Sequence, residues 1–363
     1  MNRNELLADQ IASALDALRA ARAKGVDWML ARLDADGRPA GAERFNNYYR
    51  LPWSLALSGQ RDRAAAVLAW IAHNALDASG DLRAGAPRAP FLGAIASYPL
   101  PQIAIGAWHL ERYDLARTIM AFVRSAMVDP HTGGAYSERP ELRHTRRTDL
   151  LCTAQVGLAA MTVGDDTLAD GCYRWTHDLL SMQPDLPRRL YPCRIGAQLL
   201  TTADPRHRAW DVVTDFHLPF QQFYNPGIAA AFLGRYGAFR NHATARELAR
   251  TTLHLNVEGA ALQFDHAVNA QICKFGWGAA VLLETDACLG HAAQALRMAR
   301  WFVESQHADG HWAPSGFLVP QPDDADKLPK TAEHVLHVVT LIGALAAHAV
   351  SLATPGHALR GTR

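Results

Sequence analysis

The chain has 363 residues, of which 36 are Lys or Arg and 35 are Asp or Glu. Nucleic acids and anionic membranes favour basic surfaces, so this balance argues against both and favours a small molecule as the ligand. No Ser/Gly tract, long charge run or low-complexity stretch divides the chain, so we expect one domain over residues 1–363.

The first predicted helix covers residues 4–23, where Leu7, Ile11, Leu15 and Leu18 recur with helical spacing. Charged residues interrupt this region throughout, so it does not have the pattern of a signal peptide. No run reaches the ~20 apolar residues of a membrane span. The five cysteines include no C-x-x-C pair, which is typical of reduced, buried thiols and predicts a cytoplasmic protein.

A repeat of about 50 residues follows. Each copy has a small-residue apolar helix, then an amphipathic helix, then a Gly-rich turn. The apolar stretches begin near Asn47, Tyr98, Thr148, Tyr224, Cys273 and Thr331. A period of this length indicates an array of helix pairs, and six pairs can close into a ring with a central cavity.

The two kinds of helix differ in which faces are apolar. Amphipathic helices, suited to an outer layer, are predicted over residues 61–76, 114–127, 165–180, 243–255 and 289–305. Helices that are apolar nearly all round, and therefore buried, are predicted over residues 100–110, 152–161, 227–233, 276–283 and 331–350. The last of these lacks an outer partner, which the N-terminal helix can supply. We find no strand pattern of convincing length, so the sequence predicts an all-α (α/α)6 toroid of six inner and six outer helices.

One step of the repeat is about 25 residues longer than the others. The excess covers residues 183–223, which contain five prolines. Long irregular insertions in compact domains are commonly lids or binding loops, although surface decoration would explain this one equally well.

The run over residues 301–312, WFVESQHADGHW, has an aromatic residue followed by Q-x-x-x-G-x-W. With Gln306, Gly310 and Trp312 it resembles the QW motif of squalene and terpenoid cyclases. The resemblance implies an α/α toroid, in which the Gln caps a helix end near the Trp and ties outer helices together. Residues 77–82 and 129–136 look like degenerate copies at equivalent turns.

The catalytic motifs of that family are absent: the chain has neither D-x-D-D nor D-D-x-x-D. The same architecture is similar to the (α/α)6 barrels of carbohydrate enzymes, which include unsaturated-uronyl hydrolases, sugar 2-epimerases and some polysaccharide lyases. Residues 45–59 and 223–237 have a matching pattern, with polar and aromatic residues at a helix start and small apolar ones after it. Fold alone does not give function.

Polar residues gather where the inner helices begin, at what would be the mouth of the cavity. We call these positions the rim; they are Asn46, Asn47, Tyr48, Tyr49, Ser97, Tyr98, Thr148, Asp149, Tyr224, Asn225, Lys274, Lys330, Thr331, Glu333 and His334. Packing of apolar helices does not require hydrogen-bonding or ionisable groups there, so their convergence indicates a binding site.

Two rim carboxylates are candidate proton carriers. Asp149 follows Thr148, a predicted N-cap, and helix capping would also explain this Asp. Glu333, which would follow a cap at Thr331, lies beside His334 and four residues before His337. A Glu and a His in a cavity can act as acid and base when their pKa values are shifted. The Glu333–His337 spacing also suits two metal ligands, but we can name no third and expect no metal.

Two further histidines follow acids, His217 after Asp215 and His266 after Asp265, and an Asp can orient a His and raise its basicity. Cys273 lies next to Lys274, and a cation at a helix N-terminus lowers a thiol pKa, although a buried inert Cys is the simpler reading. Aromatic residues on the inner helices, Trp277 among them, would fill the core or line an apolar pocket.

Three hypotheses follow. In the first, an enzyme performs acid–base chemistry on a terpenoid- or polyketide-like compound as an isomerase, cyclase or lyase. Its proton carriers would be Glu333, Asp149 and one of His334, His217 and His266, and its substrate-binding residues Asn47, Tyr48, Tyr98, Tyr224, Asn225, Lys274 and Trp277. The second is a carbohydrate enzyme, in which Arg44, Arg50, Arg146 or Arg147 could bind a carboxylate or hydroxyls. The third is a non-catalytic scaffold. No nucleotide-binding fingerprint is present, so we expect no cofactor, and a homo-oligomer is left open.

Overall fold

The computed structural model describes residues 3–83, 95–143, 145–202, 212–265, 272–286 and 288–353. Over these residues helices dominate and alternate between two layers. The outer helices are α1 (Arg3–Leu30), α3 (Arg61–Asn74), α5 (Tyr113–Phe122), α7 (Asp166–Ser181), α9 (Ala243–Glu258) and α11 (Leu289–Glu304). The inner helices are α2 (Leu51–Leu57), α4 (Pro99–His109), α6 (Leu150–Val163), α8 (Tyr224–Phe239), α10 (Cys273–Thr285) and α12 (Asp324–Ala353).

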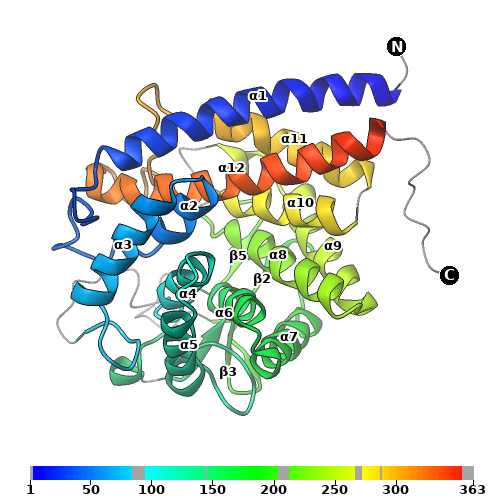
Figure 1. Ribbon diagram of the computed structural model, residues 1–363. Helices are drawn as coiled ribbons and strands as arrows, with labels where there is room; N and C mark the ends of the chain where they lie inside the picture. The colour runs from blue at the N-terminus through cyan, green and yellow to red at the C-terminus, as the bar shows by residue number, and fades with distance from the viewer. Residues whose placement is uncertain are drawn as a thin grey trace.

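The inner helices form a closed ring. Each of α2, α4, α6, α8 and α10 contacts the next inner helix along the chain, and α12 contacts α2. Every inner helix also contacts its outer partner, and the first helix, α1, packs on the last, α12 (Figure 1). This confirms the (α/α)6 toroid and the predicted role of the N-terminal helix in closing it.

Small residues let the inner helices approach closely. A Cβ added at Gly227 of α8 would lie 2.2 Å from the carbonyl carbon of Lys274 in α10, and one added at Gly157 of α6 would lie 2.4 Å from the ring of Phe232. Gly227 therefore sets the distance between α8 and α10 at the turn of helix that carries Lys274. The packing that makes the ring also positions a rim residue.

Four glycine turns tie the outer helices together. Gly37, Gly80, Gly133 and Gly310 have φ of 82°, 88°, 81° and 103°, a conformation that favours glycine. Each turn closes an outer helix or, for Gly133, the π-helix η2 (Val123–Met127) that continues α5. Added Cβ atoms there would meet backbone of α3, α5, α7 and α1 respectively, so each turn packs on the next outer helix of the ring.

The last of these turns belongs to the QW-like run. The Gln306 side-chain amide donates hydrogen bonds to the carbonyls of Gly310 and of Ala21 in α1, both at 2.8 Å. Trp312 is fully buried, and its indole N–H donates to the carbonyl of Phe302 at 3.0 Å. The tie between outer helices that the resemblance implied is therefore present, between α11 and α1.

Among the described residues, short strands and two 3₁₀ turns accompany the helices. Strands β1 (Arg147–Asp149), β3 (Cys193–Ile195) and β4 (Gln198–Leu199) form one antiparallel sheet, and β2 (Arg189–Leu190) pairs with β5 (Thr214–Asp215). The 3₁₀ turns are η3 (Pro140–Leu142) and η5 (Ala261–Phe264). These strands have two or three residues each, too short to show an alternating pattern, so the all-α prediction is confirmed. Since β3 and β4 belong to the insertion, β1 anchors it directly before α6.

Two helix starts differ from prediction. Helix α12 begins at Asp324, not at Thr331, because Asp323 and Asp326 exchange backbone-to-carboxylate hydrogen bonds that cap it. The Thr331 hydroxyl instead bonds the backbone of Trp312. Asp149, not Thr148, is the N-cap of α6: its carboxylate accepts the backbone N–H of Cys152.

Among the described residues, α12 is the one helix whose length and composition would allow it to cross a membrane. Its apolar character has a simpler cause in this fold. As an inner helix it lies between α2 and α10 and is covered by α1 and α11. Residues 328–338 are buried among these helices, whereas the later part of α12 has an exposed side that includes Val350.

Candidate functional site

Glu333 is the centre of a buried charged cluster at the mouth of the ring. Its Oε1 accepts hydrogen bonds from Arg50 Nη2 at 3.0 Å and Lys274 Nζ at 2.5 Å, and its Oε2 accepts one from Lys330 Nζ at 3.0 Å. We call these four residues the Glu333 cluster. All four are at least nine-tenths buried.

The cluster is assembled from three inner helices. Arg50 directly precedes α2, Lys274 lies in the first turn of α10, and Lys330 and Glu333 lie one turn apart on α12. Because α12 packs on α2, residues far apart in sequence meet there, as Arg50 and Glu333 do at a separation of 283. The closed ring is what brings these charges together.

Tyrosines enclose the cations. The Arg50 guanidinium lies 4.5 Å from the ring centre of Tyr49, and its Nη2 is 3.4 Å from the Tyr98 hydroxyl. Lys274 Nζ lies 5.1 Å from the ring centre of Tyr224. Burial raises the pKa values of Tyr49 and Tyr98 well above the ordinary value of a tyrosine, so both side chains remain neutral hydrogen-bonding groups.

Glu333 is held ionised. Burial alone would raise its pKa, but Arg50, Lys274 and Lys330 outweigh burial and hold the pKa well below its usual range. Burial lowers the pKa of Lys330, opposed by the attraction of Glu333. A carboxylate with three cationic partners is a weak base and does not carry a proton at neutral pH.

His334 and His337 are buried neutral imidazoles on the same face of α12. His334 Nδ1 lies 2.8 Å from the Lys330 carbonyl, which only accepts, so Nδ1 carries the proton and Nε2 has a lone pair. Nε2 is buried without a hydrogen-bond partner. Burial lowers the pKa of His334 well below its ordinary value and that of His337 to about 3. Trp301 and Trp312 stack against His334, and Trp277 stacks against His337.

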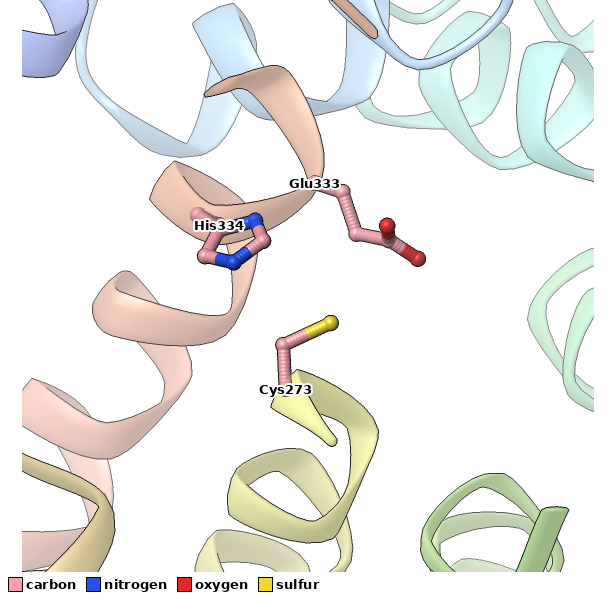
Figure 2. A group of neighbouring side chains, drawn as sticks. All are labelled: Cys273, Glu333 and His334. Carbon is pink, nitrogen blue, oxygen red and sulfur yellow. The ribbon is translucent and has the colours of Figure 1, made fainter. Parts of the chain in front are cut away.

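Cys273 completes a group with Glu333 and His334, shown in Figure 2, where its sulfur points toward the other two side chains. One potential ligand atom from each residue lies within 4.8 Å of the others. Geometry alone would let them hold a metal ion, but the cations on Glu333 would repel it. Burial raises the pKa of Cys273 to about 11, so the activated thiolate is disfavoured by the structure.

Asp149 lies in a neighbouring part of the mouth. It lines a cavity of about 30 Å³ with Arg147, Tyr224 and Asn225, and residues Pro192 and Cys193 of the insertion cover the same cavity. Burial raises the pKa of Asp149 despite hydrogen bonds from the Cys152 backbone and the Ser137 hydroxyl. Tyr224 connects this cavity to Lys274 and the Glu333 cluster.

The structure places the predicted site residues in three groups. Glu333, His334, Lys274, Tyr98, Tyr224 and Trp277 belong to or contact the cluster and its histidines, and Asp149 and Asn225 line the adjoining cavity. Tyr48 and Asn47 face elsewhere: Tyr48 packs edge-on against Trp70 of the outer helix α3, and the Asn47 amide donates to the Ala40 carbonyl. His217 is exposed in the insertion, and His266 lies outside the described residues.

Arg50 and Lys330 are central to the cluster but were not among our leading site residues. Arg50 was one of four arginines considered for a carbohydrate substrate. Of the others, Arg44 forms an exposed pair with Asp323, Arg146 is exposed, and Arg147 is buried at the Asp149 cavity. The signal available in sequence was the position of Arg50 directly before an inner helix.

No family model matches the chain, and no curated protein matches it. Among solved structures, a D-mannose isomerase is 10% identical, with 90% of this chain and 96% of that chain covered and a TM-score of 0.63. A GH76 α-1,6-mannanase from Salegentibacter is 11% identical, with coverage of 92% and 99% and a TM-score of 0.59. A type II terpene cyclase from Scytonema, solved with geranylgeranyl dihydroxybenzoate, is 14% identical, with the same coverage and a TM-score of 0.57. At such identities the likeness shows the toroid fold alone.

Proposed function

We propose that this protein is an enzyme that transfers protons on a small organic substrate held at the mouth of the ring, as an isomerase or lyase does. The observation that carries the proposal is the presence of buried titratable groups in two neighbouring parts of the ring mouth, with pKa values displaced in opposite directions. The Asp149 pKa is raised, while those of Glu333, His334 and His337 are lowered. Such separation is how one site keeps an acid and a base at the same pH.

Each group then has a role that fits its surroundings. His334 Nε2 removes a proton from a carbon next to a carbonyl, and the electron pair moves onto the carbonyl oxygen. Lys274, Arg50 and the Tyr98 hydroxyl stabilise that oxyanion. Asp149, the group with the raised pKa, returns a proton at the neighbouring atom. Glu333, which we expected to be a proton carrier, instead orients the cations.

The cluster argues against terpenoid cyclisation through a carbocation. Fixed cations at Arg50, Lys274 and Lys330 would repel a positively charged intermediate, whereas they stabilise an enolate. A polyketide-like compound with an enolisable carbonyl remains within the proposal. A non-catalytic scaffold would have no use for a buried cation cluster at the ring mouth, so we set that hypothesis behind the enzyme.

A sugar is the second candidate substrate. Trp53, Trp277 and His337 form a contiguous aromatic group on three inner helices, and aromatic faces suit the apolar faces of sugar rings. Isomerisation of an aldose also passes through an enediolate, so the same oxyanion chemistry applies. Two of the structural neighbours are a D-mannose isomerase and an α-1,6-mannanase. The described part of the insertion, residues 183–202 and 212–223, would act as a lid on the Asp149 cavity, which Pro192, Cys193 and Gln222 line.

Solvent deuterium exchange tests the proposal directly. The protein is incubated in D2O with 2-hydroxy acids, keto acids, uronic acids and aldoses, and carbon-bound deuterium is measured by NMR. We expect exchange into one class and a loss of about 10²–10⁴-fold in His334→Gln, the range for a general base. His348→Gln is the matched control, because His348 is another buried histidine near the far end of α12. Exchange that His334→Gln leaves unchanged would remove His334 from the mechanism.

A further inference from the structure

We infer that the substrate carries an anionic oxygen group, a carboxylate or a phosphate, which binds the Arg50–Lys330 side of the Glu333 cluster. The inference rests on the proposed function, because it names the substrate class of the same site. It depends on the charges of the cluster and on one unused donor.

Arg50 and Lys330 share a single carboxylate. Over the described residues, Glu333 is the one acidic group within ion-pair distance of either cation. Arg50 is 6% exposed and Lys330 is 5% exposed, so water does little to compensate them. Two buried cations therefore share one negative charge, and Lys274 is a third cation paired with the same carboxylate.

A buried arginine elsewhere in the chain shows the contrast. Arg139, also 6% exposed, pairs with Asp81 and Glu141, so two carboxylates serve one guanidinium. The Asp81 side chain, only 12% exposed, is enough to compensate the Arg139 charge, and an uncompensated buried charge costs several kcal/mol. The excess of positive charge at the ring mouth is therefore better explained by a missing anion.

An unused hydrogen-bond donor points to the same ligand. The Nε–H of Arg50 is buried and has no hydrogen-bond partner, while Nη2 already bonds Glu333 and Tyr98. Buried donors are nearly always satisfied, and a guanidinium suits an oxyanion in particular. An anionic oxygen at Arg50 Nε would satisfy the donor and the charge together.

The anion would also activate the proposed base. Burial and, after it, the charge of Lys330 lower the pKa of His334. A negative group bound between Arg50 and Lys330 offsets part of that effect, so His334 becomes a stronger base when the substrate is present. Substrates with the anionic group close to the reacting carbon, such as hydroxy, keto or uronic acids, fit this arrangement.

Binding of simple anions tests the inference without requiring turnover. The probes are malonate, inorganic phosphate and neutral malonamide, titrated calorimetrically at constant ionic strength. We expect malonate or phosphate, but not malonamide, to bind. Arg50→Gln and Lys330→Gln should each weaken that binding about tenfold to a hundredfold, the range for a charged hydrogen bond. Lys327→Gln, which removes the same charge one turn earlier on α12 and outside the cluster, should leave it unchanged.

Each outcome decides the matter. Equal binding of malonamide, binding of no anion, or equal affinity in wild type and both cluster variants overturns the inference. If Arg50→Gln does not fold, Lys330→Gln and Glu333→Gln remain, and Glu333→Gln should bind the anion more tightly because a competing carboxylate is gone. Selective anion binding without deuterium exchange in any compound upholds the inference and counts against the proposed function. Deuterium exchange confined to neutral compounds upholds the proposed function and overturns the inference that the substrate is anionic.

Discussion

Replacing Glu333 by Gln should destabilise the protein, and an added anion should restore much of the loss. Gln keeps the size and hydrogen-bonding capacity of the side chain, so the substitution chiefly removes the charge that Arg50, Lys274 and Lys330 share. Removing one partner of a buried ion pair costs about 3–5 kcal/mol because the remaining charge stays buried.

The size of the effect on thermal unfolding follows from chain length. An unfolding entropy of about 2.1 cal/mol/K per residue over this chain gives about 0.76 kcal/mol/K, so the Tm should fall by about 4–7 °C. Malonate at a concentration of a hundred times its Kd should raise the free energy of unfolding by about 2.7 kcal/mol. The variant should gain more from malonate than the wild type does, because its cluster has one more uncompensated positive charge.

Thermal unfolding followed by circular dichroism at pH 7.5, with ionic strength held constant, measures both effects. Glu258→Gln is the control, since Glu258 is an exposed carboxylate paired with His254 and its loss should change stability by no more than about 0.5 kcal/mol. An unchanged Tm in Glu333→Gln, or a variant that malonate stabilises no more than KCl does, would refute the electrostatic reasoning.

Three further predictions concern other parts of the molecule. Burial, together with the charges of Lys274, Arg50 and Lys330, lowers the pKa of His337 to about 3 in the folded protein, while Glu333 acts in the opposite direction. His337 is therefore neutral when folded, but it becomes charged near pH 6.5 when the chain unfolds. Its contribution to stability is therefore lost as pH falls below about 6.5, by up to about 1.4 kcal/mol per pH unit. His337→Asn should reduce the fall in urea-unfolding stability between pH 7 and 5 by this amount and leave the part that His334 contributes. Gly310→Ala should destabilise far more than Gly164→Ala, because an added Cβ meets Lys24 backbone at the first and open space at the second. Asp149→Asn should keep the N-cap and the Tm. It should abolish deuterium incorporation at the neighbouring atom, where Asp149 returns the proton, but not exchange at the carbon that His334 deprotonates; incorporation at the neighbouring atom at the wild-type rate would contradict the role of Asp149.

The helical ring was predictable because its cause is local. Gly- and Ala-rich stretches such as residues 227–233 have no polar face, and amphipathic partners follow them at a regular spacing. The start of α12 was not predictable from Thr331, since Asp323 and Asp326 cap the helix about two turns earlier. Helix ends depend on single caps, whereas helix existence depends on many residues at once.

The site was predictable as a place but not as a set of contacts. Sequence put Glu333, Lys274 and Tyr98 at one rim, but it carried no information on which cation crosses the ring to which carboxylate. Tyr48 and Tyr49 show the limit most clearly. These neighbours precede α2 and look equivalent in sequence, yet Tyr49 lies against Arg50 while Tyr48 packs on the outer helix α3.

The pairing of α1 with α12 has a consequence for how the protein is made. A ribosome releases α1 first and its inner partner last, and synthesis of the intervening residues takes about 15–60 s at ordinary elongation rates. During that time Ile11, Leu18 and Met29, all fully buried in the finished ring, have no partner to cover them. The apolar stripe of α1 therefore stays uncovered until α11 and α12 are made and the ring closes, and chaperone demand should fall on this helix.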